Sequence, residues 1–480
     1  MKTVLCWFRR DLRVRDHTAL YHAARDGERV VPFFIVDPAL MAPPHGGAPR
    51  VTFLLQSLHV LDENLKRLGG KLIVRQGDPV AEVVALLREA EAEAVYVNRD
   101  YIAPGLARDR AVQKAVEEAG FAYHDFKDLL LVEPDDLLTG EGKPYTVYTP
   151  YWRAWQRQPI AAPLSEPEKP LETPDLKSIA IPRPSDLGWT TNADIAAGGE
   201  DVVLALLGRF TRETKDGAPI QGYETRRNVP AEKGTSFLSP HLRFGTLSPR
   251  TALKAARDAA ASARARGDAE KGAVIWESEL AWREFYWAWM AHFPYVLEHP
   301  FDRRYDKMPY DDDDDLYDAW RHGQTGFPIV DAGMRQLNKE GWMHNRLRMI
   351  TASFLTKDLL MDYRKGEAYF WEHLTCGDKP ANMGGWQWSA SVGTDAQPYF
   401  RVFNPVTQGE RYDPTGAYVR RYVPELEALP DKHIHSPWTL PDNEASKLGF
   451  QLGKTYPAPI VDHAERRLRA IETFKAIRSS

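Results

Sequence analysis

Cysteine is nearly absent from this chain, which holds only Cys6 and Cys376 among its 480 residues. Two thiols so far apart in sequence argue against a disulfide framework and against a multi-cysteine metal site, and they are typical of a reducing compartment. The chain also lacks an apolar run of membrane-spanning length and the apolar core of a signal peptide. These absences predict a cytoplasmic protein that does not contact membranes.

A net positive charge is missing as well. The 62 Lys and Arg residues face 67 Asp and Glu residues, which gives a formal charge of −5. Any contact with nucleic acid must therefore come from a local basic patch. The remaining composition, with 43% hydrophobic and 27% charged residues, is that of a globular protein and excludes wholesale disorder. Tryptophan is abundant, with 14 residues.

The first third of the chain alternates apolar strands with amphipathic helices. Strands are predicted at Thr3–Phe8, Val30–Val36, Lys71–Val74 and Ala94–Val97, and helices at Thr18–Ala24, Val51–Leu68, Pro79–Glu91 and Leu106–Glu118. This order predicts a doubly wound parallel sheet. The glycine-rich dinucleotide fingerprint is missing after the first strand, where Arg9 and Arg10 follow instead, so no nicotinamide site is expected.

The rest of the chain is predicted to be helical. We divide it into an α/β domain at 1–130, an interdomain linker at 131–200 and a helical domain at 201–480. Residues 158–188 are dense in proline, serine and charge, which is typical of a linker or surface loop. Helices are predicted at Arg250–Arg266, Val274–Ala291, Asp331–Leu337, Trp342–Leu360, Gly366–Leu374 and His463–Ile477. The acidic run Asp311–Asp315 is interpreted as a solvated loop, since a metal site needs ligands of defined geometry.

The stretch from Gly377 to Pro405 has an unusual composition for a buried helix. It is poor in aliphatic residues and holds an Asp, an Asn, a Gly-Gly pair and two tryptophans one residue apart. Such a mixture suggests a backbone that approaches a flat, partly polar ligand, because a structural core favours Leu, Ile and Val. An aromatic-rich core helix is the alternative that this stretch alone leaves open.

A second candidate lies on the helix expected around Trp276–Trp289. Glu279, Trp282, Arg283 and Tyr286 share one of its faces by three- and four-residue spacing. A carboxylate, an indole and a guanidinium on one face suit a planar ligand that stacks and hydrogen-bonds. A tryptophan-rich core edged by a Glu279–Arg283 pair is the alternative.

Two further segments hold polar side chains that are suited to binding a ligand. Around Gly341–Met349 the chain is locally basic, and arginines beside aromatics hold phosphates and unstacked bases. In Lys233–Gly245, hydroxyls stand ahead of a predicted helix start, where they can cap the helix or bind a diphosphate.

Several long sequence motifs of the chain resemble those of a known family. They are WFRRDLRVRD from Trp7 to Asp16, TSFLSPHLRFGTLSPR, ELAWREFYW, TGFPIVDAGMRQL, GWMHNRLRMITASFLTKDLL and GGWQWSASVGTDAQPYFRVFNP. In these strings the chain resembles the cryptochrome/photolyase family, and specifically the microbial class I cyclobutane pyrimidine dimer photolyases, over nearly its whole length. The resemblance implies a Rossmann-like α/β domain joined by a long linker to an all-helical domain that binds FAD.

The resemblance also implies which residues hold FAD in a folded U-shape. The matched flavin-binding positions are Tyr223, Thr235, Ser236, Phe237, Leu238, Ser239, Trp276, Arg283, His344, Arg348, Gly377, Asp378 and Asn382. Asn382 would lie beside N5 of the isoalloxazine ring, where an amide can accept or donate as the proton comes and goes.

The implied reaction is the light-driven splitting of a pyrimidine dimer that is flipped out of UV-damaged DNA. Reduced FAD donates an electron to the dimer and receives it back after the ring has split. Glu279, Asn382 and Trp386 are the expected catalytic residues. The matched lesion and DNA contacts are Arg226, Arg227, Glu279, Trp282, Asn345, Arg346, Met349, Trp388 and Arg401. The His344-Asn345 pair favours dimer repair over repair of the pyrimidine–pyrimidone photoproduct. A monomer is expected, and a cryptochrome-type photoreceptor is the alternative.

The chain departs from the family pattern in its electron-transfer residues. Relatives reduce their flavin through three tryptophans; here Trp386 matches the first, whereas the second and third fall on Tyr363 and Tyr310. Tyrosine is harder to oxidise unless its proton leaves too. We therefore expect slower or rerouted photoreduction, with a detour through Trp371, Trp320 or Trp342.

Two other departures concern a charge and an antenna. Cys376 stands where the family has an aspartate paired with the arginine matched by Arg348, and a neutral thiol cannot supply that charge. Relatives often bind a folate or deazaflavin antenna in the α/β domain. His45 matches one folate contact, but the family's glutamate falls on Leu106, so the resemblance leaves the presence and type of antenna open.

Overall fold

The computed structural model describes residues 2–214 and 217–479, which form two compact units. Unit 1 comprises Met1–Thr191, Ala196–Tyr223 and Ser236–Pro294, and unit 2 comprises Asn192–Ile195, Glu224–Thr235 and Tyr295–Ser480. These units do not follow the boundaries expected at residues 130 and 200, which stay predictions.

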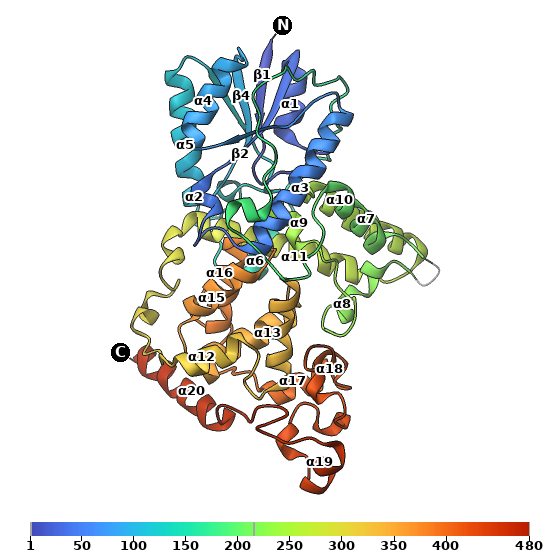
Figure 1. The fold of residues 1–480 in the computed structure, drawn as a ribbon, viewed down its shortest axis with the longest axis vertical. Coiled ribbons are helices and arrows are strands. Elements are labelled where there is room, and N and C mark those ends of the chain that lie inside the picture. Colours follow the sequence, from blue (N-terminus) through green and yellow to red (C-terminus); the bar gives the residue numbers. More distant parts are fainter. Residues whose placement is uncertain (1, 215–216, 480) are drawn as a thin grey trace. The chain divides into compact units, whose positions relative to one another are not determined.

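Unit 1 is built on a five-stranded parallel sheet, as predicted (Figure 1). β1 (Thr3–Trp7) lies at its centre between β2 (Arg29–Val36) and β4 (Ala94–Asn98), and β3 (Ile73–Gln76) and β5 (Ala122–Phe126) form the edges. All pairings are parallel. Every residue of β1 is buried, because helices cover both faces of the sheet. This burial explains its continuous apolar run.

The helices of the sheet lie in two layers. α1 (Thr18–Asp26) and α3 (Ala48–Arg67) cover one face, and α4 (Pro79–Glu89) and α5 (Ala103–Glu118) cover the other (Figure 1). The short α2 spans Pro38–Met41. Because the chain changes direction after β3, β1 and β4 lie side by side with their carboxyl ends at the point where the strand order reverses.

Strand β5 was not predicted from the sequence. Each of its residues is exposed or half-buried, and within the described sheet it pairs only with β4. A half-solvated edge strand needs no apolar run, so the sequence signal used for the other four strands is missing here.

The proline-rich stretch 158–188 is tied to the sheet domain. The backbone carbonyl of Leu171 accepts from Val30 N at 2.7 Å, and the amide of Ile179 donates to the Val74 carbonyl at 3.0 Å. Leu171 itself is buried. The segment therefore behaves as a surface loop of unit 1, one of the two interpretations that its composition allowed.

Unit 1 also contains a group of helices that follow β5. They are α6 (Tyr148–Trp155), α7 (Glu200–Thr211), α9 (Ser239–Phe244), α10 (Pro249–Arg266) and α11 (Lys271–His292), and α8 (Tyr223–Arg226) crosses the boundary between the units. α10 packs its alanine face on α11, and Ala252, Ala256, Leu280 and Phe285 belong to their shared core. Small side chains on α10 leave room for the large rings of α11.

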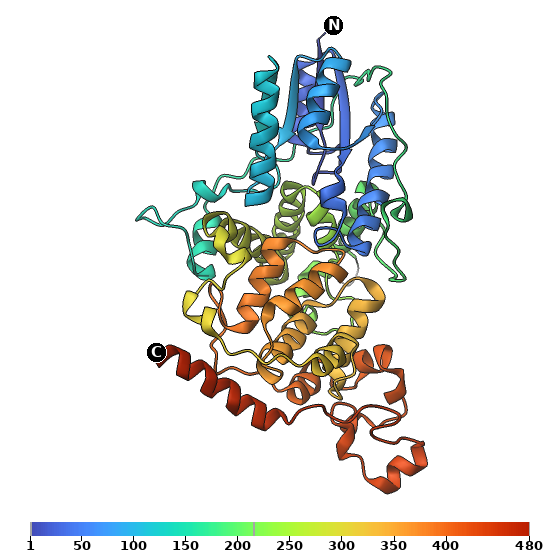
Figure 2. The same cartoon turned by 60° about the vertical axis from the view of Figure 1, so that its left-hand side comes forward.

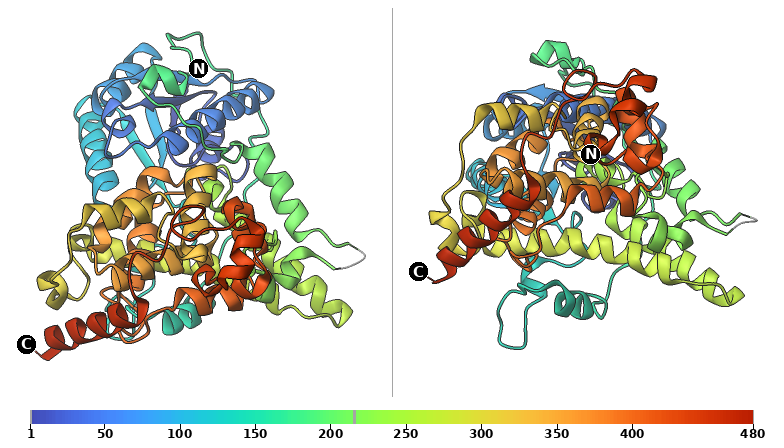
Figure 3. Two further views of the ribbon diagram at one scale, coloured as in Figure 1. Left: turned by 60° about the horizontal axis from the view of Figure 1, so that its bottom comes forward. Right: turned by 90° about the horizontal axis from the view of Figure 1, so that it is seen from below.

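Unit 2 is helical. Its helices are α12 (Asp314–Arg321), α13 (Pro328–Glu340), α14 (Asn345–Ser353), α15 (Tyr363–His373), α16 (Lys379–Ala390), α17 (Pro405–Tyr412), α18 (Ala417–Tyr422), α19 (Asp442–Leu448) and α20 (His463–Ser479). α13–α16 pack together (orange in Figure 3), and α20 carries the C-terminus (Figure 2). No helix among the described residues combines the length and apolarity that a membrane span requires.

Two predictions in unit 2 need correction. The helix expected at Trp342–Leu360 begins at Asn345, because His344 caps it through Nδ1, and it passes into a π-helical turn at Phe354–Asp358. The acidic run is also not simply a solvated loop. Asp313 caps α12, Asp314 and Asp315 form its first turn, and Asp311 pairs with two arginines of α20. Acidic residues at a helix start complement its dipole.

Candidate functional site

Helix α11 presents the first group of candidates, all within unit 1. Trp276 is buried, and its indole Nε1 donates to Ser236 Oγ at 3.2 Å. Glu279, Trp282 and Arg283 are half-buried and share one face of α11 by their helical spacing; that this face meets a ligand stays a prediction. Tyr148 stacks on the Trp282 ring at 3.6 Å between centroids and 11° between planes. This stack fixes the orientation of the indole.

Arg283 contacts the backbone of the segment before α6, and the alternative of a Glu279–Arg283 pair at the edge of a core stays open. Arg283 Nη1 donates to the carbonyl of Leu129 at 3.0 Å. The neighbouring Glu284 was not predicted to matter, yet it is buried and accepts from Val132 N at 3.2 Å and Trp155 Nε1 at 2.8 Å. Glu284 thus anchors α11, and its charge within a tryptophan-rich helix was the available signal.

The hydroxyl string 235–239 does not cap a helix. α9 begins at Ser239 with Leu238 as its N-cap residue, and no side-chain capping bond is formed. Phe237 has a φ of 56°, which turns the backbone sharply before the helix. Ser239 is exposed, whereas Thr235 Oγ1 is buried without a hydrogen-bond partner among the described residues. Of the two uses weighed for these hydroxyls, capping is excluded.

His344 is the most informative candidate in unit 2. It is buried, and its Nδ1 accepts from Arg346 N at 3.1 Å, so the ring proton lies on Nε2. Burial, together with nearby Arg346, Arg348 and Arg227, lowers the pKa of His344 to about 4, so the ring is neutral at pH 7. Nε2 finds no partner among the described residues. A buried donor left unpaired in this way is suited to a ligand acceptor.

Arg348 contacts the cysteine that replaces the expected aspartate. Its Nε donates to the Met343 carbonyl at 2.9 Å, and its Nη2 lies 3.2 Å from Cys376 Sγ. The guanidinium therefore keeps a neighbour at this position, although a neutral thiol is a far weaker acceptor than a carboxylate.

Asn382 is held in one orientation on α16. Its Nδ2 donates to the Glu367 carbonyl at 3.0 Å and to Glu367 Oε1 at 2.8 Å. Lys379 pairs with the same carboxylate at 2.8 Å. Because both amide protons are used, Asn382 Oδ1 is the atom that this geometry leaves to accept from a ligand. Glu367 was missed by sequence reasoning, which had no signal for a contact across 15 residues.

The lesion candidates of unit 2 differ in how firmly they are held. Arg346 donates to Asn228 Oδ1 at 2.6 Å and lies 4.4 Å from the centroid of the Tyr412 ring. Asn345 is exposed beside Met349, with 4.0 Å between Nδ2 and Sδ. Trp388 is half-buried. These side chains form a polar and apolar mixture within reach of solvent.

The remaining candidates stand as follows. Tyr223 is buried against Phe210 in unit 1. In unit 2, Asp378 is the N-cap residue of α16 without a side-chain capping bond, and Gly377 precedes it. Arg226 is exposed and pairs with Glu232 at 3.0 Å, and Arg401 is exposed. The structure describes each unit by itself, so it brings together the candidates of one unit and leaves the joint arrangement of the two groups a prediction.

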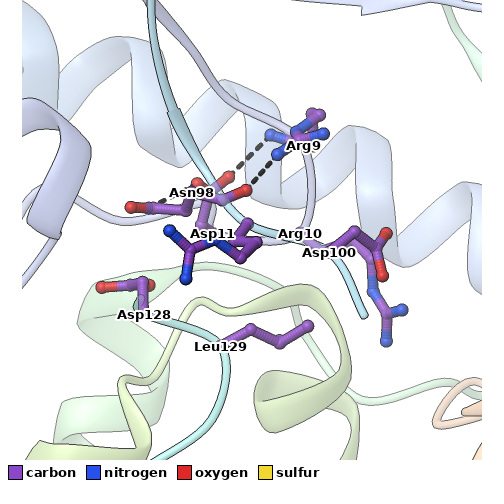
Figure 4. Close-up of a pocket in the computed structure, with 8 residues that line it drawn as sticks. Arg9, Arg10, Asp11, Asn98, Asp100, Asp128 and Leu129 are labelled. Atoms are coloured by element: carbon purple, nitrogen blue, oxygen red, sulfur yellow. Dashed lines mark hydrogen bonds between the residues drawn. The ribbon is translucent and has the colours of Figure 1, made fainter. Parts of the chain in front are cut away.

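A small pocket of about 270 Å³ lies in unit 1 at the carboxyl ends of β1 and β4 (Figure 4). Arg9, Arg10 and Asp11 line it after β1, and Asn98 and Asp100 line it after β4. Arg9 pairs with Asp109 and with the Asn98 carbonyl, and Asn98 Nδ2 donates to Asp11 at 2.7 Å. Ligands of open α/β sheets bind at such a reversal of strand order.

The donor set of unit 2 fits the flavin cofactor that the sequence implies. Thr235 Oγ1, His344 Nε2 and Thr375 Oγ1 are buried without partners among the described residues. FAD offers diphosphate, ribose and ring-carbonyl oxygens as acceptors. Burying unpaired donors costs free energy unless a ligand satisfies them.

Comparisons with known proteins agree with this fit. Residues 276–476 match a family model described as the FAD binding domain of DNA photolyase, and residues 4–172 match one described as DNA photolyase. A relative from Agrobacterium fabrum named deoxyribodipyrimidine photo-lyase is 41% identical, over 99% of this chain and 98% of its own.

Solved structures give the same picture. A bacterial class III photolyase from Agrobacterium tumefaciens is 39% identical with a TM-score of 0.91, and covers 100% of this chain and 98% of its own. A cryptochrome from Synechocystis is 31% identical with a TM-score of 0.90, and covers 98% of this chain and 99% of its own. The class I assignment therefore stays a prediction. The chain belongs to the DNA photolyase family of FAD-dependent DNA repair enzymes.

Proposed function

We propose that this protein repairs cyclobutane pyrimidine dimers in UV-damaged DNA in a light-dependent reaction. The observation that carries the proposal is the face of α11 on which Glu279 and Trp282 lie one turn apart, with Tyr148 stacked on the indole. A rigid aromatic surface beside a carboxyl group suits a base taken out of the duplex, which must be stacked on and hydrogen-bonded by its edge.

We further propose how the chain's residues hold FAD, which supplies the light-driven electron transfer when bound. His344 donates from Nε2, Asn382 accepts at Oδ1, and Arg348 and Asp378 provide charge. Tyr223, Trp276, Arg283, Gly377 and the hydroxyls at 235–239 complete the set. Glu367 keeps the Asn382 amide in one orientation, so the chain presents a fixed acceptor where the flavin ring exchanges a proton.

DNA is bound by a different set of side chains in this proposal. Arg226, Arg227 and Arg401 contact phosphates, and Asn345, Arg346, Met349 and Trp388 meet the flipped lesion together with Glu279 and Trp282. Flipping a base costs a few kcal/mol and less for a damaged, poorly paired lesion, so this cost favours dimers over intact bases. A monomer in the cytoplasm stays our prediction.

The decisive experiment exposes a dimer-containing oligonucleotide and the reduced protein to blue light or darkness. We expect light-dependent recovery of intact thymines. Glu279→Gln should lower the repair rate by about tenfold, because a hydrogen bond to a charged group is worth about 1.5–3 kcal/mol. Glu277→Gln is the matched control, since its carboxylate lies on another side of α11 and pairs with Arg257 at 2.9 Å.

The alternative function, a cryptochrome-type photoreceptor, makes a different prediction in the same assay. A photoreceptor would bind FAD and respond to light without restoring thymines. Absence of repair by the fully reduced protein would thus favour it over the proposed function.

Replacing Cys376 with aspartate tests the departure at Arg348. We expect Cys376→Asp to keep FAD bound and to stabilise the fold by up to about 1 kcal/mol, because the new carboxylate accepts from Arg348 Nη2. FAD content by absorbance and the urea midpoint are the measurements. Cys376→Ser, which adds no charge, is the control. Loss of flavin from the aspartate variant alone would instead assign a role to the thiol.

For the antenna we propose the pocket at the ends of β1 and β4 as its place, if one is bound. Arg9, Arg10 and Asp11 line this pocket, so a chromophore bound there would meet charged side chains. His45 is exposed and Leu106 half-buried, and neither lines this pocket, so a folate contact through His45 would lie elsewhere.

A further inference from the structure

We propose that Trp320 is the second electron donor in the chain of residues that reduces the flavin. The family pattern would assign this role to Tyr363. The proposal rests on the proposed function, in which Trp386 is the donor next to FAD. Trp320 lies on α12 and Trp386 on α16, both within unit 2.

The two indoles are in direct contact. Their ring centroids lie 6.1 Å apart in an edge-to-face arrangement with 73° between planes. Trp320 is fully buried and Trp386 is 2% exposed. Contact within the usual range of aromatic pairs leaves no intervening group across which an electron must pass.

Hydrogen bonding makes Trp320 the easier of the two to oxidise. Trp386 Nε1 is buried without a partner among the described residues, so a positive charge on this ring receives no hydrogen-bond stabilisation. Trp320 Nε1 donates to the Thr351 carbonyl at 3.0 Å. Because a carbonyl acceptor favours the charged form of the donor, an electron deficit moves from Trp386 to Trp320.

Tyr363 has the opposite properties. It is 1% exposed, and its hydroxyl has no hydrogen-bond partner within the described part of the chain. Burial raises the pKa of Tyr363 well above its ordinary value. A phenol whose hydroxyl has no acceptor for its proton is a poor electron donor, which disfavours Tyr363 as the donor that follows Trp386. Burial likewise raises the pKa of Tyr310.

Tyr369 provides the exit toward solvent. Its ring lies 5.7 Å from that of Trp320, and it is half-buried. Burial raises the pKa of Tyr369 too, to about 12, but its hydroxyl, unlike that of Tyr363, donates a hydrogen bond, to Asn338 Oδ1 at 2.8 Å. Tyr317 is equally close at 5.9 Å, but Lys365 and Arg321 lie 5.5 and 5.9 Å from the centroid of its ring and oppose positive charge there. Positive charge on Trp371 is opposed in the same way, because Lys379 lies 5.1 Å from the centroid of its ring.

The step balances as single-electron transfers. Trp386 loses one electron to light-excited, oxidised FAD, and Trp320 then gives one electron to Trp386. Tyr369 gives one electron to Trp320 and releases its phenolic proton to water. A thiol reductant in solution returns one hydrogen atom to Tyr369, which restores the chain.

The test compares light-driven flavin reduction in the wild type and in Trp320→Phe, in the presence of a dithiol. We expect the variant to reduce its flavin about tenfold more slowly or worse, and transient absorption should show the Trp386 cation signal decaying by recombination instead of moving outward. Tyr369→Phe should slow the later phase only. Trp438→Phe, at a 36% exposed indole outside this chain of rings, is the matched control.

Chemical reduction separates this proposal from the proposed function. After dithionite treatment, Trp320→Phe should repair dimers at the wild-type rate, which also shows that it folds. Trp320→Tyr is the second variant, with an intermediate photoreduction rate expected. Photoreduction at the wild-type rate in both variants, or its loss in Tyr363→Phe or Trp371→Phe instead, would overturn the proposal. Failure of the reduced wild type to repair would refute only the proposed function.

Discussion

Replacing Asp128 with alanine should destabilise unit 1 by about 3–5 kcal/mol, because two buried arginines would lose their shared partner. Asp128 is buried and accepts from Arg13 Nη2 at 2.5 Å and from Arg250 Nη2 at 2.8 Å. Thr18 N and Thr18 Oγ1 donate to the same carboxylate at 3.1 and 2.8 Å. The loss is a large fraction of the stability of a typical domain, roughly 5–15 kcal/mol.

The direction of the Asp128 pKa supports this expectation. Burial by itself raises it, but Arg13 and Arg250 outweigh burial and hold the pKa well below its ordinary value. A carboxyl group with a lowered folded-state pKa contributes stability at neutral pH that is lost only when the pH falls through that value. The network therefore stays ionised under ordinary conditions.

Urea unfolding measures the effect. Asp128→Ala should shift the unfolding transition of unit 1 to a much lower urea concentration. Asp128→Asn should lose less stability, since an amide oxygen still accepts hydrogen bonds. Asp136→Ala, at an exposed position, is the matched control and should change stability by less than about 0.5 kcal/mol. Equal transitions for Asp128→Ala and the control would show that the buried charges find other partners.

Acidification should destabilise both units through two buried histidines, by up to about 3 kcal/mol each. Burial lowers the pKa of His241, in unit 1, to about 4. His344, in unit 2, has a pKa lowered to the same value by burial and by its arginine neighbours. Each ring is neutral in the folded state and binds a proton more readily when unfolded. This stability is complete above pH 6.5 and is lost as the pH falls toward 4.

Comparing variants separates the contribution of the histidine to the pH dependence of stability from that of the carboxylates, which titrate in the same range. His241→Gln should flatten the pH dependence of the unit 1 transition between pH 6.5 and 4, measured by urea midpoints. His59→Gln replaces an exposed histidine and should retain the wild-type slope. An unchanged slope in His241→Gln would mean that this ring is already protonated in the folded protein.

The sequence by itself determined the elements whose signal is local. Continuous apolar runs placed four of the five strands, because those strands are covered on both faces. The three- and four-residue spacing of Glu279, Trp282 and Arg283 placed them on one face of α11. Long matching strings gave the family, which the comparisons confirm.

Only the tertiary structure decided the contacts between distant segments. Asp128 meets Arg250 across 122 residues, Glu284 meets Leu131 across 153, and the Glu367 carboxylate holds Asn382. The same is true of the Trp320–Trp386 contact, which singles out one of three candidate tryptophans. Whether a buried polar atom has a partner depends on which side chains folding brings within hydrogen-bond distance, and residue spacing along a chain carries no record of that.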